Sequence, residues 1–365
     1  MTNSRRRTLN QKDLSSCGIA GIICESGRRS DGTTILKCIA NMRERSNGLG
    51  GGFAAYGIYP KRADHYALHL AYDTPAARAQ TEALLEARCE VGADEPIPTR
   101  PVATITNPPI LHRYFVRAKA DDLSRKPQQT EEDLIVALVM DINGGVADAF
   151  VYSSGKDMGV FKGVGYPEDI GEFFRLEAYE AHTWIAHGRF PTNTTGWWGG
   201  AHPFGLLDWA IVHNGEISSY GINRRYLANF GYYCTLQTDT EVIAYLFDLL
   251  IRKHNLPMEA AFSAMAPPFW SEMDSMSEEE RRRARALRVV YGGALLNGPF
   301  SVIVGHRGGM IGFSDRIKLR PMVAARDGEW LYIASEEAAI REVCPDPKVV
   351  WRPRGGEAVI GELKS

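Results

Sequence analysis

The order of strand-like and helix-like segments predicts an α+β fold built as a layered sandwich. Strand patterns gather near the beginning of the chain and again over residues 300–365, while helical patterns dominate much of the region between them. Connections between these segments are mostly short. Strict alternation of strands and helices, which would indicate a parallel sheet, is not observed.

Composition sets the broad class of the protein. Of the 365 residues, 44% are apolar and 24% are charged, which is ordinary for a globular protein and excludes a chain that is disordered throughout. The net charge of −2 argues against a general nucleic-acid binder. No apolar run approaches the length of a membrane span, and the polar first residues lack the apolar stretch of a secretory signal. We therefore expect a cytoplasmic protein with no nucleic-acid and no membrane partner.

The first part of the chain predicts three strands and one helix. The apolar run at 18–24 predicts a buried strand, and the glycine-rich stretch at 47–59 predicts a turn that leads into a second strand. A third strand is expected at 65–72. Between the first two, Ile35, Ile39 and Met42 recur at helical spacing over 32–45, with Asp31 as the expected N-cap.

The pattern weakens between residues 73 and 146. Residues 74–90 predict a helix, and the proline-rich stretch at 95–109 predicts a connector or an extended edge. We interpret this region as an elaboration of one domain. Regular patterns return with two strands joined by a polar turn at 147–163 and a helix at 167–176, followed by strands at 183–187 and 209–213.

A long helix is expected after Thr238, because apolar residues from Val242 to Leu250 form one stripe. The charge-rich segment 257–291 predicts further helix and a second elaboration, whose charge run is either a docking surface or a solvated face. The C-terminal part predicts short strands and a helix at 335–343.

Cysteine and histidine spacing argues against a metal centre. The six cysteines are sparse, and no two form a CxxC pair, so a disulfide framework or a cysteine-bound zinc or iron–sulfur centre is not expected. Four of the nine histidines fall within residues 182–213, but without a metal-binding spacing such as HExxH. We predict that the chain holds no metal.

Four short segments contain residue types that can perform chemistry, and each also has a purely structural interpretation. Cys17 stands before the first buried strand and is either a small buried residue or, at a freed N-terminus, a nucleophile that uses its own α-amine as base. Arg189 leaves a strand just before Pro191 and forms either an ordinary ion pair or a fork for a carboxylate. Asn214 and Gly215 form either a hairpin turn or a pair of N–H donors for an oxyanion.

The fourth segment is QTDTEVIAY (237–245). Thr238 and Glu241 have the spacing of a capping box, and Asp239 in the first turn favours the helix dipole. The functional interpretation is that the Asp239 carboxylate binds the amino group of a substrate.

Taken together and in this order, the four segments resemble the class II glutamine amidotransferases, which are N-terminal-nucleophile hydrolases with a four-layer αββα sandwich. The resemblance begins at Cys17 and covers nearly everything to about residue 360. Within that family, the chain most resembles the stand-alone amidotransferase subunit of archaeal-type glutamate synthase. The segments that carry this narrower resemblance are NGLGGGFAAYGIYP, FVYSSGKDMGVFKGVGYPEDI, GWWGGAHPFGLLDWAIVHNGEISSYGINRRY, LNGPFSVIVG, DRIKLRPMVAA and SEEAAIREV.

The resemblance implies a role for each matching residue. Cys17 would be the nucleophile, with Asn214 and Gly215 as the oxyanion hole. Arg189 would bind the α-carboxylate of L-glutamine and Asp239 its α-ammonium group. Two further residues would line the same pocket, namely Thr192 and His202.

Because Cys17 is internal, these roles require that residues 1–16 are a propeptide removed between Ser16 and Cys17, which leaves a domain at 17–365 with elaborations at about 73–146 and 257–291. The chain itself would need no cofactor, since the flavin and iron–sulfur centres implied by the resemblance would belong to synthase partner subunits. Two alternatives stay open: the amidotransferase subunit of N-methylglutamate synthase, and a non-catalytic regulatory subunit that keeps the fold.

Overall fold

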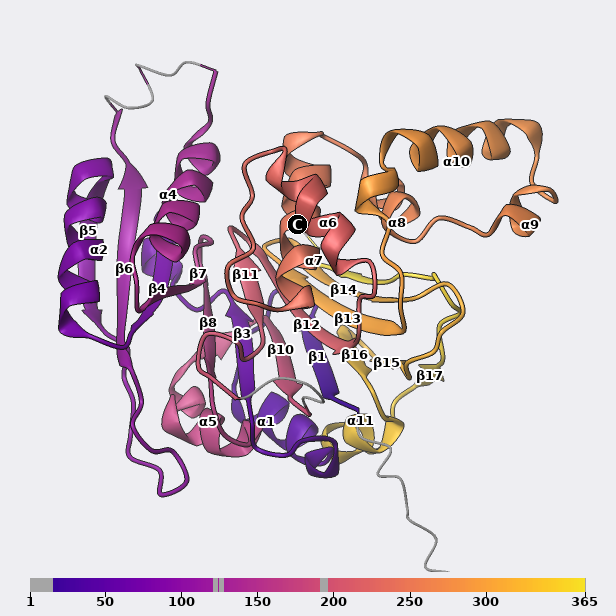
Figure 1. The fold of residues 1–365 in the computed structure, drawn as a ribbon. Helices are drawn as coiled ribbons and strands as arrows, with labels where there is room; N and C mark the ends of the chain where they lie inside the picture. Colours follow the sequence, from indigo (N-terminus) through magenta and orange to yellow (C-terminus); the bar gives the residue numbers. More distant parts are fainter. Residues whose placement is uncertain (1–15, 121–123, 125–127, 191–195, 365) are drawn as a thin grey trace, which may run out of the picture.

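Two antiparallel sheets packed face to face form the centre of the molecule (Figure 1). The computed structural model describes residues 16–120, 124, 128–190 and 196–364. The larger sheet has the strand order β17-β15-β16-β1-β10-β3-β8 and the smaller one the order β11-β12-β13-β14-β18. Their strands are β1 (Gly18–Cys24), β3 (Gly51–Tyr56), β8 (Met158–Gly163), β10 (Thr183–Gly188), β15 (Val323–Asp327), β16 (Trp330–Ala334) and β17 (Val349–Trp351) in the larger sheet, and β11 (Phe204–Leu206), β12 (Trp209–Gly215), β13 (Phe300–His306), β14 (Gly309–Ser314) and β18 (Val359–Glu362) in the smaller one.

Helices cover the outer face of each sheet, which completes four layers. The larger sheet is covered by α1 (Thr33–Ala40), α5 (Pro167–Phe173) and α11 (Glu337–Val343). The layer beside the smaller sheet holds α6 (Tyr220–Ala228), α7 (Asp239–Phe247) and α8 (Met258–Met265), and α7 continues into a π-helical segment, Asp248–Lys253. A short ribbon of β2 (Ser30–Asp31) and β9 (Glu180–Ala181) lies apart from both sheets. The expected α+β sandwich of type αββα is confirmed.

The contact between the two sheets explains why their strands are apolar on both faces. Every residue of β1 is buried, because one face meets the helices and the other meets the smaller sheet. The approach is close: a side chain on Gly21 would come within 2.5 Å of the Met310 sulfur.

A third sheet forms the four-stranded unit (residues 66–153). Its elements are β4 (Tyr66–Tyr72), α2 (Pro75–Arg88), β5 (Cys89–Pro96), β6 (Ile110–Ala118), α4 (Glu131–Gly145) and β7 (Ala149–Ser153), and its strand order is β5-β6-β4-β7. All neighbouring strands are antiparallel, so this is the split βαβ arrangement of ferredoxin-like folds. The segment that we interpreted as a first elaboration, 73–146, is the middle of this unit.

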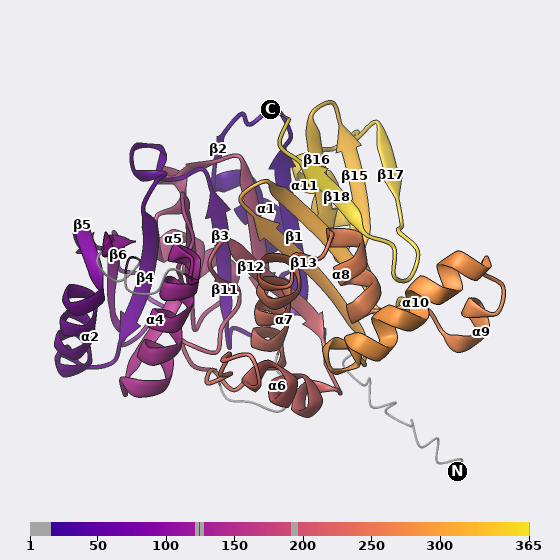
Figure 2. The same cartoon turned by 90° about the horizontal axis from the view of Figure 1, so that it is seen from above.

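The segment interpreted as a second elaboration, 257–291, contains α8, α9 (Trp270–Met273) and α10 (Glu278–Val290). In both views, α9 and α10 lie at the opposite end of the molecule from the four-stranded unit (Figures 1 and 2). Helix α10 buries none of its residues, and a capping box between Ser277 and Glu280 closes its first turn.

Several local predictions need correction. The helix expected at 32–45 ends at Ala40, and its N-cap is Gly32. Asp31, which was expected to be the N-cap, lies one residue before it. Its side chain accepts a hydrogen bond from the N–H of Thr33, the first residue of the helix (3.0 Å). The two strands expected at 147–163 form, but they belong to different sheets. The proline-rich stretch needs no correction: it was expected to be a connector or an extended edge, and its first two residues belong to edge strand β5, which ends at Pro96.

Candidate active site

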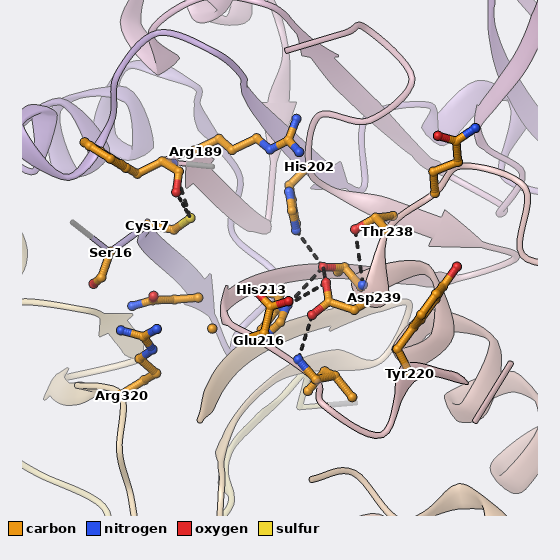
Figure 3. Close-up of a pocket in the computed structure, with 16 residues that line it drawn as sticks. Ser16, Cys17, Arg189, His202, His213, Glu216, Tyr220, Thr238, Asp239 and Arg320 are labelled. Atoms are coloured by element: carbon orange, nitrogen blue, oxygen red, sulfur yellow. Dashed lines mark hydrogen bonds and ion pairs between the residues drawn. The ribbon is translucent and has the colours of Figure 1, made fainter. Parts of the chain in front are cut away.

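A cavity of about 260 Å³ lies where the ends of β1, β10 and β12 meet the first turn of α7 (Figure 3). It brings together six of the seven site residues expected from the sequence. Among the described residues, the lining consists of Ser16, Cys17, Arg189, Phe190, His202, His213, Asn214, Gly215, Glu216, Ile217, Tyr220, Gln237, Thr238, Asp239, Thr240 and Arg320. The seventh expected residue, Thr192, and residues 1–15 of the expected propeptide lie outside the described residues.

Cys17 directly precedes β1 and lies beside the end of β10, which Arg189 follows. Its Sγ accepts a hydrogen bond from the Phe190 N–H at 3.3 Å. Burial raises the pKa of the Cys17 thiol, while the Phe190 N–H and the charges of Arg189 and Arg320 act in the opposite direction. On the other side of the Ser16–Cys17 peptide bond, the Ser16 hydroxyl accepts a hydrogen bond from Arg45 (2.6 Å).

Arg189 follows β10, whose last residue, Gly188, pairs with Gly18 of β1. This register places the arginine next to Cys17, and its backbone N–H donates to the Gly50 carbonyl at 2.9 Å. The side chain is largely buried, which lowers the pKa of its guanidinium, while Cys17 and Asp239 oppose that shift. Arg189 therefore brings a positive charge into the wall of the cavity.

Asn214 and Gly215 end β12 and pair with β13, so they are strand residues and not the hairpin turn considered from the sequence. Asn214 is buried, and neither its amide nitrogen nor its amide oxygen has a hydrogen-bond partner among the described residues. At Gly215 the backbone has φ +152°, and a side chain would come within 2.0 Å of the Pro299 carbonyl oxygen. Only glycine fits there.

Asp239 starts α7 and faces the cavity from the smaller sheet's side. Its Oδ2 accepts a hydrogen bond from the Ile217 N–H at 2.7 Å, and its Oδ1 lies 3.7 Å from His213 Nδ1. Burial raises the pKa of this carboxyl, but His213, the Ile217 N–H and Thr240 outweigh it, and the pKa is lowered. Asp239 thus remains a carboxylate at neutral pH.

The expected capping box beside Asp239 does not form. Thr238 accepts a hydrogen bond from the Thr240 N–H (3.3 Å), but Glu241 turns to the N–H groups of Thr235 and Leu236, at 3.1 and 3.0 Å. Thr238 therefore caps the helix alone. Through these two hydrogen bonds, Glu241 holds the preceding loop against the helix.

Buried histidines lie at one wall of the cavity: His202 and His213 line it, and His187 lies behind His202. The rings of His187 and His202 stack with centroids 4.0 Å apart, and Thr240 Oγ1 lies 2.7 Å from His202 Nε2 and 3.0 Å from His213 Nδ1. Burial, helped by the neighbouring cationic groups, lowers the pKa of His202 well below its usual value. In the part of the chain that the structure describes, no three His, Cys, Asp or Glu side chains are grouped as a metal site requires.

Sequence reasoning missed several residues of this lining, above all Arg320, Glu216 and Tyr220. Arg320 directly precedes Pro321 between two strands, and Arg189 likewise stands close before a proline, so a weak indication was present. Over residues 16–120, 128–190 and 196–364, no helix is long and apolar enough to cross a membrane.

Comparisons with known proteins agree with this geometry. The chain is 51% identical over 364 residues to an uncharacterized protein of Archaeoglobus fulgidus, which covers 99% of this chain and 96% of the relative. It is 28% identical to a protein of Methanothermobacter thermautotrophicus that carries the provisional name glutamine amidotransferase, over 95% of this chain and 100% of the relative.

A shorter match links the chain to a larger enzyme. Over 185 residues it is 34% identical to the isomerizing glutamine–fructose-6-phosphate aminotransferase of Mesorhizobium japonicum, which covers 47% of this chain and 27% of that enzyme. The family model for "Glutamine amidotransferases class-II" matches residues 80–231, a range that includes Arg189, His202, Asn214 and Gly215. The chain belongs to the class II glutamine amidotransferases.

Proposed function

We propose that this chain is the glutaminase subunit of a glutamate synthase complex, and that it releases ammonia from L-glutamine through a thioester on Cys17. One observation carries the glutaminase part of the proposal: Cys17, Arg189, Asn214 and Asp239 come from four separate segments and line one cavity. Their charges match a zwitterionic amino acid, with a cation for the carboxylate and an anion for the ammonium group.

The nucleophile becomes active only after residues 1–16 are removed. In the intact chain the nitrogen of Cys17 is an amide, which cannot accept a proton. Cleavage after Ser16 frees an α-amine with an ordinary pKa of about 7.7–8.0. Roughly a tenth to a sixth of it is neutral at pH 7 and can take the thiol proton, and this share grows as the pH rises.

The chemistry then proceeds in two halves. The Cys17 thiolate attacks the side-chain amide carbon of glutamine, a carbon–sulfur bond forms, and the carbonyl electron pair moves to the oxygen. Asn214 Nδ2 and the Gly215 N–H donate to this oxyanion. When the intermediate collapses, the carbon–nitrogen bond of the substrate amide breaks. The α-ammonium group of Cys17 returns its proton to the leaving nitrogen, which departs as ammonia. Water then hydrolyses the γ-glutamyl thioester to glutamate and restores the thiol.

Substrate orientation follows from the two charged walls. Arg189 would hold the α-carboxylate in a two-pronged pair, and Asp239 would hold the α-ammonium. His202 and Thr192 would complete the pocket. Because burial keeps His202 neutral, its ring would serve as a hydrogen-bonding wall and would not compete with Arg189 for the carboxylate.

The acceptor of the ammonia is assigned by sequence resemblance. The segments listed for archaeal-type glutamate synthase support 2-oxoglutarate as acceptor, bound on partner subunits that carry flavin and iron–sulfur centres. Isolation of the native complex tests this assignment: co-purifying subunits with those cofactors and glutamine-dependent glutamate formation are expected. Co-purification with a methylamine-using synthase would instead support the N-methylglutamate alternative.

The glutaminase assignment is tested by replacing Cys17. In Cys17→Ala, glutamate release from glutamine should fall to background, while Cys234→Ala, which changes a cysteine outside the cavity, should keep the wild-type rate. Intact-mass measurement of the native protein should show a chain that begins at Cys17. Full activity in a chain that retains residues 1–16 would contradict the mechanism, and absence of activity in correctly trimmed protein would favour the regulatory alternative.

A further inference from the structure

A second arginine faces Cys17 from a loop to which neither the sequence motifs nor the mechanism above assigns a role. Residues 315–322 connect β14 of the smaller sheet to β15 of the larger one. Arg320, near the end of this loop, lines the cavity. Figure 3 shows Arg320 on the same side of the cavity as Ser16 and Cys17, across from Asp239 and Tyr220.

The loop holds Arg320 in a fixed place. Asp315 accepts hydrogen bonds from the N–H groups of Ile317 (3.0 Å), Leu319 (2.9 Å) and Phe300 (3.2 Å), which tie the turn to β13. The Arg320 carbonyl accepts a hydrogen bond from the Ser301 hydroxyl at 3.2 Å. Ile317 and Leu319 point to solvent, with 59% and 56% of their surfaces exposed, so the turn presents apolar side chains outward and Arg320 inward.

The charge of Arg320 has no acidic partner in the described ranges. No ion pair joins it to an Asp or Glu there, and its Nε is buried without a hydrogen-bond partner among those residues. A buried polar nitrogen without a partner is costly, and because Arg320 lines the cavity, a group bound there can pair with its guanidinium.

A charge count suggests what that group is. The zwitterion of glutamine needs one cation and one anion, and Arg189 and Asp239 supply them. Arg320 is therefore a surplus cation, and it lies on the wall where the reaction creates negative charge, first on the Cys17 sulfur and then on the amide oxygen. Along with Arg189, it lowers the pKa of the Cys17 thiol against the effect of burial.

We propose that Arg320 is an electrostatic support for catalysis: its guanidinium stabilises the Cys17 thiolate and the oxyanion that follows. The same charge disfavours a second cation nearby, so it keeps a larger share of the freed α-amine of Cys17 neutral and able to accept the thiol proton. This inference rests on the proposed glutaminase function, and it concerns a residue outside the set that the resemblance supplies.

The test compares trimmed wild-type protein with Arg320→Gln and Arg320→Lys, and with Lys318→Gln as a matched loss of charge from the same loop that does not line the cavity. Glutamate release is measured from about pH 5 to about pH 9. In a separate assay, alkylation of Cys17 by iodoacetamide is followed on its own peptide by mass spectrometry over the same range.

We expect Arg320→Gln to lower kcat at least about tenfold with little change in KM, because the lost stabilisation concerns the transition state. The acid limb of its rate profile and its alkylation profile should both move to higher pH. Arg320→Lys should retain most of the rate and both profiles, and Lys318→Gln should match the wild type.

Two results would overturn the inference: wild-type kcat and pH profiles in Arg320→Gln, or a rise in KM alone, which would make Arg320 a substrate-binding residue. Its failure is distinguishable from failure of the proposed function. Inactive wild-type protein would refute the glutaminase, whereas the alkylation profile of Cys17 reports on Arg320 even without turnover.

Discussion

The cavity and the four-stranded unit differ in how they bury charged and amide side chains. In the unit, buried Arg113 donates to Glu95 and to the hydroxyls of Tyr59 and Tyr179. Even His112, which has one ring nitrogen without a partner, places the other 2.8 Å from Asp94. In the cavity, both amide atoms of Asn214 are buried and lack a partner among the described residues.

This difference in how buried polar groups are paired indicates that the cavity serves ligand binding and the unit serves stability. Polar atoms buried without partners cost about 1–3 kcal/mol each. In the described part of the unit they are the hydroxyls of Tyr66 and Tyr152 and one nitrogen of His112, whereas at the cavity they include charged and amide groups that a bound ligand can pair with. Substitutions in the cavity should therefore change catalysis more than stability, and core substitutions in the four-stranded unit should do the reverse.

The largest effect is expected for Asp239→Asn. The amide keeps an acceptor for the Ile217 N–H, so the fold should survive, but the negative charge that would pair with the substrate ammonium is lost. Loss of one partner of a buried charge pair costs about 2–5 kcal/mol, which corresponds to a rise in KM of at least about 30-fold. Steady-state glutaminase kinetics measure it.

Asp141→Asn is the matched control, because Asp141 is an exposed carboxylate of the four-stranded unit that pairs with Arg88. Its KM should equal that of the wild type. A KM for Asp239→Asn within a factor of about three of the wild type would show that the ammonium group binds elsewhere.

The sequence predicted which residues line the cavity better than it predicted the strands of the four-stranded unit, and the reason is physical. The cavity residues stand in short segments whose local order is distinctive, as with Cys17 before an apolar run and Asn214 at the end of another. The roles of these residues came from the joint resemblance, since each segment alone was compatible with a structural interpretation.

The four-stranded unit depends on pairings that no local pattern specifies. Strand β4 pairs with β6 and β7, which lie far along the chain, and β5 is an exposed edge whose composition is that of a loop. Arg320 was missed for a related reason: only the folded connection between the two sheets brings it near Cys17. For Gly215 the sequence offered a turn or an oxyanion-hole donor, but the close approach that requires glycine there comes from Pro299, 84 positions later in the chain.

A core substitution in the unit should give the next largest effect. Ile142 of α4 is fully buried in the apolar cluster shared with β4 and β6. Ile142→Ala should lower the free energy of unfolding by about 3 kcal/mol through lost burial and the cavity it leaves. Glutaminase kinetics below the melting temperature should stay within about twofold of the wild type.

Chemical denaturation measures this loss, and Val289→Ala on exposed α10 serves as the control, with a change below about 0.5 kcal/mol. A large fall in kcat for folded Ile142→Ala would break the contrast between the two regions, because it would show that the packing of the unit sets the geometry of the cavity.

The smallest effect concerns Lys162, a buried cation of β8 that does have partners. Its Nζ donates to the Gly199 carbonyl at 3.0 Å and lies 4.2 Å from the centre of the Phe204 ring. Burial still lowers its pKa to about 7, from an ordinary value near 10.5. The protonated form is thus less stable in the fold than in the unfolded chain, and the cost is complete below about pH 7 and disappears as pH rises towards 10.5.

Lys162→Met removes this titration. At about pH 6 the gain from losing a buried charge should exceed the loss of its hydrogen bond and ring contact, for a net stabilisation of about 1–2 kcal/mol. Towards about pH 10 the wild type no longer bears the cost, so the variant should lose its advantage and become the less stable of the two. Denaturation curves at both pH values measure the change, and exposed Lys348→Met should differ by less than about 0.5 kcal/mol at either. Suppose instead that the variant is less stable than the wild type by the same amount at both pH values. The hydrogen bond and ring contact of Lys162 would then fully compensate the burial of its charge.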